Sequence, residues 1–559
     1  MKKLNRICLT YAATVAVVLT LVLAPVARTM AQADGQKPAV VVSIASVDGL
    51  LADIGYLTKA AGSPEMGGFI NLMSGQFIGG LDTKKPSGVY VNVIGETPRV
   101  VGFVAVSDFD QVVNTIEQSG FAGELEDIGG GVRKLSVQQQ DIFIKHQGGW
   151  AFISDAAANL NGLPEDPSKL LAGLNEQYNI GIRVSVQSIP KSLREQAIGF
   201  IQSGFEQAMA AQSGNATDIE LQESLGRQSI EDLNQFVEEA DEITIGWGVN
   251  KEDGKTYLDF AVTAIDGTNL AKEIAASTST KSNFTGFLLP EAAATLHFTS
   301  TIAAKEKTQL LEMLKVLRTS AGAELDNDDD IPNDELRELA KKFVDSMVDI
   351  LDATVETGTV NGGAAVVLSA DTVQFVAGGF VADGNAVEKE LKKLVKLAKE
   401  AETGAELDNV KFNAEKHKDV NLHTFSVPIP EDEQDARRVL GDRLDVVVGT
   451  GPQSAYVAFG KDCIDLLKKV IDASAEENSA LPMSLTISVG KILEFATTFG
   501  VDPAVAEMAA MLKDSAGKDT IAMTAKALER GIRYRFEIGE AVLGLIGQGV
   551  RIQANQNEF

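Results

Sequence analysis

The residues whose spacing best suits chemistry are His417, Asp419, Asn421 and His423, which alternate along the chain. If residues 417–423 form one strand, these side chains share a face. Imidazole and carboxylate groups gathered on one face could then hold a zinc ion. The alternative is that the first of them lie in a solvated turn that leads into a strand. The spacing leaves both readings open, so we assign no metal ligand and no cofactor.

No G-x-S-x-G motif occurs, so the usual sequence signal of a serine nucleophile is missing. The remaining candidate nucleophile is Cys463. Cys463 shares a helical stripe with Leu467 and Val470, which predicts a buried, hydrophobic cysteine. Gly449 to Gly451 follow an apolar run, but a strand is expected after them where a phosphate site would need a helix N-terminus. A hairpin turn is the better interpretation, and the catalytic residues stay unknown.

The acidic run Asp326–Asp330 resembles the start of a calcium loop, with oxygen-bearing side chains at alternate positions. Ile331 stands where such a loop needs glycine, and Arg337 stands where it needs glutamate. We therefore interpret residues 323–332 as an acidic linker. Further along, a predicted helix carries five lysines opposite its apolar stripe, interspersed with Glu388 and Glu390, and we expect a solvated face there: Lys389, Lys392, Lys393, Lys396, Lys399.

The N-terminus has the order of a secretory signal. Lys2, Lys3 and Arg6 precede an apolar run, and the A-x-A spacing of Ala31 and Ala33 follows it. We predict a signal peptide over residues 1–33, with the bond after Ala31 as a second choice for cleavage. A retained membrane anchor is the alternative, although the run is short for a span. Export would place the protein in the periplasm or outside the cell.

The net charge limits which partners the protein can bind, and the cysteine content limits what can stabilise its fold. The chain carries a net charge of −28, and removal of residues 1–33, which hold four basic and no acidic residues, leaves −32. Such a charge repels nucleic acid and anionic lipid surfaces. One cysteine remains after cleavage, so no internal disulfide can form. An exported chain of this kind must depend on its hydrophobic core.

An element order of strand, helix, hairpin, helix recurs four times along the chain. Period-two alternation and helical stripes define it. The expected first strands are about 39–46, 180–189, 294–302 and 484–489, and the hairpins are about 88–106, 242–265, 363–382 and 520–538. After the first and third occurrences come further strands at about 132–137, 141–146 and 150–154, and at about 420–427, 444–449 and 455–459.

This order predicts an α+β fold of two similar halves, residues 34–282 and 283–559, that arose by duplication. Each half should be antiparallel sheet with helices packed on one face, because hairpins outnumber crossover connections. The alternative to a duplication is that any α+β chain can be divided into strands, helices and hairpins in this way. After cleavage, no later stretch approaches the length of a transmembrane segment.

The chain resembles the large exported proteins of planctomycete-type bacteria. The signal sequence and the phrase from Tyr178 to Gln187, followed by Ile189-Pro190, carry this resemblance, which covers the whole chain loosely. The resemblance implies no activity.

We expect a non-enzymatic binding or scaffolding protein of the cell envelope, with a hydrophobic ligand as one version. The reason is that no acid, base, nucleophile or metal set stands out. A hydrolase whose carboxylates meet only in the fold is one alternative, since the chain has 78 acidic residues. A structural component of an envelope or surface layer is another.

Overall fold

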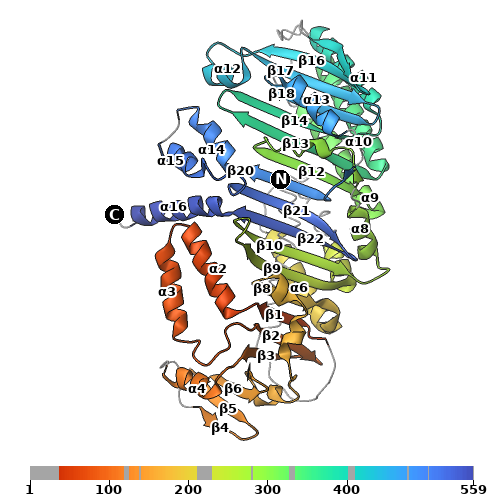
Figure 1. Cartoon of the computed structure of the whole chain (residues 1–559). Helices are drawn as coiled ribbons and strands as arrows, with labels where there is room; N and C mark the ends of the chain where they lie inside the picture. Colours follow the sequence, from red (N-terminus) through yellow and green to blue (C-terminus); the bar gives the residue numbers. More distant parts are fainter. Residues whose placement is uncertain are drawn as a thin grey trace. The chain divides into compact units, whose positions relative to one another are not determined.

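The computed structural model describes residues 37–118, 125–137, 140–210, 230–278, 281–326, 334–400, 410–474, 478–500 and 503–557. The predicted signal peptide lies outside these residues. Within them the fold is mixed α+β, with extensive antiparallel sheet (Figure 1). The chain divides into two compact units. Unit 1 comprises residues 1–251 and 256–271, and unit 2 comprises residues 252–255 and 272–559.

The sheet of unit 1 pairs its strands in the order β4–β5–β6–β7–β3–β2–β1–β8–β9–β10. Neighbouring strands are antiparallel. Their bounds are β1 Val40–Ile44, β2 Ser87–Ile94, β3 Thr97–Ala105, β4 Glu126–Asp127, β5 Val132–Val137, β6 Gln140–Gln147, β7 Trp150–Ser154, β8 Ile180–Ser185, β9 Ala240–Asn250 and β10 Lys255–Ala264.

Helical segments cover both faces of the unit 1 sheet. Val40 belongs to a core with α6 (Lys191–Ala210) and the helical residues 230–239, whereas its neighbour Val41 belongs to a core on the other face. That second core is closed by η1 (Ala157–Leu160), η2 (Pro167–Leu171) and α5 (Leu174–Gln177). The remaining helices are α2 (Val47–Ala60), α3 (Pro64–Gly75) and α4 (Phe109–Gln118). The boundary between the units in the sequence falls within α8 (Asn269–Ser277).

The sheet of unit 2 pairs its strands in the order β15–β16–β17–β18–β14–β13–β12–β20–β21–β22, again antiparallel. Their bounds are β12 Ala294–Thr301, β13 Thr359–Ser369, β14 Thr372–Phe380, β15 Lys411–His417, β16 Val420–Pro428, β17 Arg443–Gly451, β18 Ser454–Gly460, β20 Met483–Ser488, β21 Thr520–Leu528 and β22 Gly531–Gly539. A separate two-stranded pair joins β11 (Lys281–Ser282) and β19 (Asn478–Ser479).

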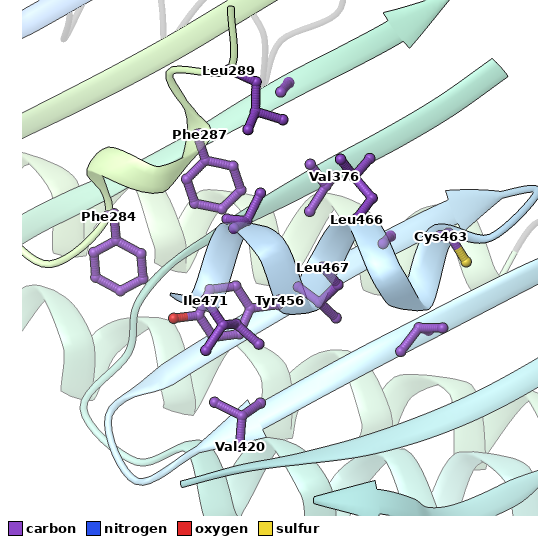
Figure 2. Close-up of a cluster of buried hydrophobic side chains, with 14 of the residues drawn as sticks. Phe284, Phe287, Leu289, Val376, Val420, Tyr456, Cys463, Leu466, Leu467 and Ile471 are labelled. Atoms are coloured by element: carbon purple, nitrogen blue, oxygen red, sulfur yellow. The ribbon is translucent and has the colours of Figure 1, made fainter. Parts of the chain in front are cut away.

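Helix α13 (Cys463–Ala473) closes one face of the unit 2 sheet. Figure 2 shows its apolar side, with Leu466, Leu467 and Ile471, lying over the strand residues Val376 and Tyr456. The other face is covered by α11 (Gly384–Glu400), which contacts β17 and β18. The other helices of unit 2 are α9 Ala304–Asp326, α10 Asp334–Glu356, α12 Gln434–Leu440, α14 Val489–Thr497, α15 Pro503–Leu512 and α16 Glu540–Asn557. Two short 3₁₀ segments complete the list, η3 (Val186–Ser188) in unit 1 and η4 (Thr285–Phe287) in unit 2.

The expectation that helices cover only one face of each sheet is therefore wrong. The physical reason is that adjacent residues of the central strands are both apolar, as in Val40 and Val41, so both faces need cover. The four predicted hairpins are confirmed, whereas the short helices α3 and α12 and the strand β15 were not predicted. The predicted linker 323–332 begins inside α9, and residues 327–333 lie outside the described part.

Glycines in the strands make room for aromatic rings. Gly378 lies opposite Tyr456 in the β14–β18 pair, and a Cβ on Gly378 would overlap the Tyr456 ring. A Cβ on Gly246 in unit 1 would likewise overlap the ring of Tyr178, which follows α5 and is not in the paired strand. The ring covers backbone that glycine would otherwise leave exposed, which offsets the low strand propensity of glycine.

Candidate functional site

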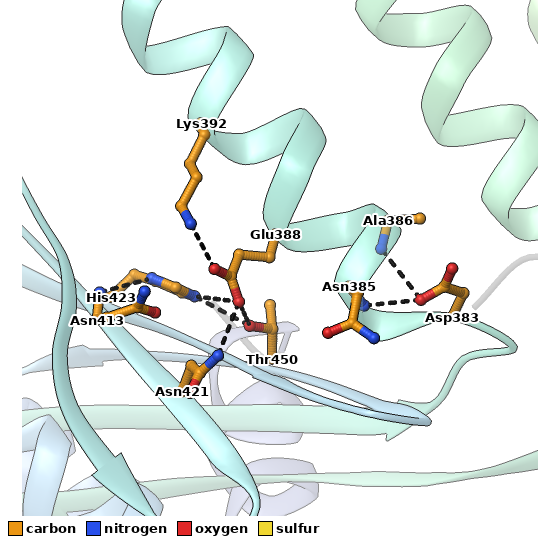
Figure 3. A network of polar contacts seen from close by, with 9 residues as sticks. All are labelled: Asp383, Asn385, Ala386, Glu388, Lys392, Asn413, Asn421, His423 and Thr450. Carbon is orange, nitrogen blue, oxygen red and sulfur yellow. Dashed lines mark hydrogen bonds and ion pairs between the residues drawn. The ribbon is translucent and has the colours of Figure 1, made fainter.

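A polar network lies where α11 crosses β16 and β17 (Figure 3). Its centre is the carboxylate of Glu388. One carboxylate oxygen, Oε1, lies 2.5 Å from Nζ of Lys392, one turn further along the helix. The other, Oε2, accepts hydrogen bonds from Asn421 Nδ2 at 2.9 Å and from Thr450 Oγ1 at 3.1 Å. The network thus joins the helix to two strands.

His423 is completely buried beside this carboxylate. Its Nδ1 accepts the backbone N–H of Asn413 at 3.1 Å, so the proton of the neutral ring is on Nε2. Nε2 lies 2.9 Å from Thr450 Oγ1. The Thr450 hydroxyl accepts a hydrogen bond from the Nε2–H group and donates one to Glu388 Oε2. The backbone of Asn413 has a φ of +51° at an irregularity in β15, and this aims its N–H at the ring.

Both titratable groups have shifted pKa values. Burial raises the pKa of Glu388, but hydrogen bonds from Lys392, Asn421 and Thr450 and the Lys392 charge outweigh it, giving a pKa of about 2. Burial lowers the pKa of His423, and Lys392 adds to this, against the opposing charge of Glu388. Glu388 is therefore ionised and His423 neutral near pH 7.

This arrangement fixes α11 in place but is poorly suited to proton transfer. Both nitrogens of His423 are engaged by protein groups, and the ring has no exposed surface. A carboxyl group with a pKa of about 2 is a weak base at neutral pH. Lys392 is held in turn between Glu388 and the ring of Phe412, which lies 5.7 Å from its Nζ. We interpret the network as a clamp between helix and sheet.

The structure separates the four residues that alternation had suggested as metal ligands. A turn at Lys418 and Asp419, with Lys418 at a φ of +52°, puts His417 at the end of β15 and His423 within β16. His417 Nε2 contacts Asp472 at 2.9 Å instead. Only Asn421 and His423 come together, in the Glu388 network. Among the residues described, no group of three or more His, Cys, Asp or Glu is placed to hold a metal ion.

Cys463 is buried in the α13 core, as its stripe predicted. Its Sγ donates weakly to the backbone oxygen of Asp445, at 3.6 Å. Burial and the nearby Asp445 charge raise the thiol pKa to about 12. A buried thiol that stays protonated at neutral pH is a poor nucleophile.

A second candidate is a surface, the outer face of α3, which we define as Met66, Phe69, Leu72 and Met73. All four residues are exposed, from 40% for Met73 to 69% for Leu72. The opposite side of α3 packs on α2 through Gly67, which approaches Gly55 and Thr58 (α2 and α3 in Figure 1). A contiguous apolar surface that the protein leaves uncovered marks a site of interaction.

Sequence reasoning missed this surface because it missed the helix. Apolar residues occur on all sides of α3, so no single stripe predicts which side is buried. Three glycines within its 12 residues also weaken the helix signal. The available signal was Pro64 after Ser63, which is typical of a helix start.

No helix in the described part of the chain combines the length and apolar character that crossing a membrane requires. Comparison with protein-family models, with curated proteins and with solved structures finds no match to this chain.

Proposed function

We propose that this protein is an exported, non-enzymatic binding or scaffolding protein of the cell envelope, and that the outer face of α3 is its contact surface. The observation that carries the proposal is the exposure of Met66, Phe69, Leu72 and Met73 on one short helix. Methionine and aromatic side chains adapt to varied apolar partners and are enriched where proteins bind one another. A convex helix face suits the surface of a partner better than a small ligand, which needs a concave pocket.

A comparison of two helix pairs supports a specialised role for α3. The pair α2–α3 connects β1 to β2, and the pair α9–α10 connects β12 to β13. The second helix of each pair differs sharply in charge: α10 has ten charged residues among 23, whereas α3 has one among 12. Solubility alone favours charge on an outer helix. The retention of large apolar groups on α3 therefore points to a partner.

The hydrolase alternative has less support. It requires a carboxyl group that exchanges a proton near neutral pH and that substrate can reach. Glu388 remains ionised, and His423 is sealed between Asn413 and Thr450.

We also propose that the two units arose by duplication. The strand orders given above correspond position by position, and so do individual bonds. In unit 1, Ala39 N–H donates to Val91 O and Ser185 N–H donates to Ala39 O, each at 2.8 Å. In unit 2, Ala293 N–H donates to Val366 O at 2.7 Å and Ser488 N–H donates to Ala293 O at 2.8 Å. Superposition of separately determined structures of the units tests this, and unlike strand connections would contradict it.

Export rests on the order of charge, apolar run and small residues at the N-terminus. Sequencing the N-terminus of protein recovered from the cell envelope or the medium tests it. We expect a mature chain beginning at Asp34. A full-length chain retained inside the cell would contradict export.

Binding of Nile red, a neutral dye that the acidic chain does not repel, tests the contact surface. We expect the protein to shift and enhance the dye emission, and Leu72→Glu to reduce this strongly, because a charge at the centre of the face disfavours apolar contact. The matched control is Leu317→Glu, since Leu317 is also an exposed leucine on an outer helix, at 51%. Equal dye binding by the two variants would contradict the proposal.

A further inference from the structure

We infer that the partner at the outer face of α3 is a second copy of this chain, docked α3 to α3 about a two-fold axis. The inference rests on the proposed function of this face as a contact surface. It identifies the occupant from charge, shape and size.

Charge favours an uncharged partner surface. Between Pro64 and Leu81 the only charged residue in the sequence is Glu65, in a chain of net charge −28. Two copies repel one another over most of their surface, so α3, whose single charge is Glu65, is the place where they can approach most closely. A basic partner would instead be recognised by acidic side chains around the face, and α3 supplies a single carboxylate.

The shape of α3 is self-complementary. Gly68, Leu72 and Gly75 follow one stripe of the helix at i, i+4 and i+7. A Cβ at Gly68 or at Gly75 would meet no atom within 4 Å, so space is open on both sides of Leu72. Leu72 of one copy can enter the space beside a glycine of the other, and a two-fold interface needs the same patch on both partners.

Size predicts a weak association. A helix of 12 residues is about 18 Å long, and such a contact buries less than the roughly 800 Å² per partner of a standard interface. We therefore expect a dissociation constant on the order of 10–1,000 μM. The contact would matter where the protein is concentrated, as in an envelope layer.

Sedimentation equilibrium over a range of concentrations, at low and at high salt, tests the inference. We expect a monomer–dimer equilibrium that strengthens with salt, because screening weakens the repulsion between two acidic copies. Leu72→Glu should remain monomeric, whereas Leu72→Met and Leu317→Glu should dimerise like the parent chain.

Three results would overturn the inference. Dimers that persist in Leu72→Glu would place the interface elsewhere. A parent chain that stays monomeric while it still binds Nile red through α3 would exclude a second copy as the partner but leave the proposed contact surface intact. A parent chain that is monomeric and also binds no Nile red would reject both the second copy as partner and the proposed contact surface.

Discussion

Gly67 of α3 packs directly on Gly55 of α2, so that a Cβ added to Gly67 would lie 3.2 Å from the Cα of Gly55 and would collide with the Thr58 hydroxyl. This close approach holds α3 against α2 and turns its apolar outer face to solvent.

Gly67→Val should force the two helices apart. We expect a loss of about 1–3 kcal/mol of local stability from the overpacking, seen as faster amide hydrogen exchange over residues 64–75. Gly68→Val is the matched control, because a Cβ at Gly68 meets nothing within 4 Å. Equal exchange in the two variants would show that the Gly67 contact does not hold α3.

The Tyr456 ring lies over Gly378, and this contact predicts that substitution of Gly378 lowers the stability of the protein. Gly378→Ala should lower the free energy of unfolding by about 1–3 kcal/mol, because a Cβ there displaces the ring. Gly102→Ala is the control, since its Cβ would meet its nearest neighbours at 3.8–3.9 Å, an ordinary contact. Urea denaturation followed by far-UV circular dichroism measures both, and similar midpoints for the two variants would contradict this account.

Thr450 is the bridge between His423 and Glu388. Thr450→Val keeps the shape of the side chain but leaves the His423 Nε2–H without an acceptor, and we expect it to cost about 1–3 kcal/mol. Thr450→Ser keeps the hydroxyl and should cost less. Both tryptophans, Trp150 and Trp247, lie in unit 1, so hydrogen exchange of α11 is the suitable measurement. Unchanged α11 protection in Thr450→Val would show that the hydroxyl is dispensable.

Acid should weaken the same clamp through both titratable groups. Glu388 has a pKa lowered from 4.5 to about 2, so its stabilisation is complete above pH 4.5 and is lost as the pH falls towards 2. The pKa of His423 is lowered below 6.5, so the unfolded chain takes up this proton first and stability also falls as the pH decreases below 6.5.

Comparison of the parent chain with Glu388→Gln isolates the Glu388 contribution. The difference in unfolding free energy between them should shrink as the pH falls from 4.5 towards 2, in urea titrations at each pH. A difference that stays constant over this range would show that Glu388 is not held ionised by the fold.

Much of the fold could be predicted from local pattern. Alternation in Ile532, Tyr534, Phe536 and Ile538 predicted the last hairpin, and the stripe of Cys463 predicted its burial. In unit 1 the cover on the second face was missed because it depends on the short 3₁₀ segments η1 and η2. In unit 2 the covering helices α11 and α13 were expected, but local pattern did not show that they pack on opposite faces of the sheet. Strand order is set by contacts between distant residues, which local pattern does not record.

The Glu388 network shows the same limit. His423 and Asn421 stood out by spacing, but their partners Glu388 and Thr450 are 33 and 27 residues away from Asn421 and His423, respectively, in the sequence. Alternation could place two of these side chains on one face. It could not show that a helix would supply a carboxylate above them, and this made a metal ion seem a reasonable occupant.

The most direct test of the central claim is whether the outer face of α3 becomes covered by a partner. An environment-sensitive bimane label at Leu72→Cys reports this, because Cys463 is buried with a raised pKa and should not react. On titration with unlabelled protein we predict a blue shift of the label at position 72 and none for the same label at Leu317→Cys. No shift at position 72, or equal shifts at the two positions, would contradict the account.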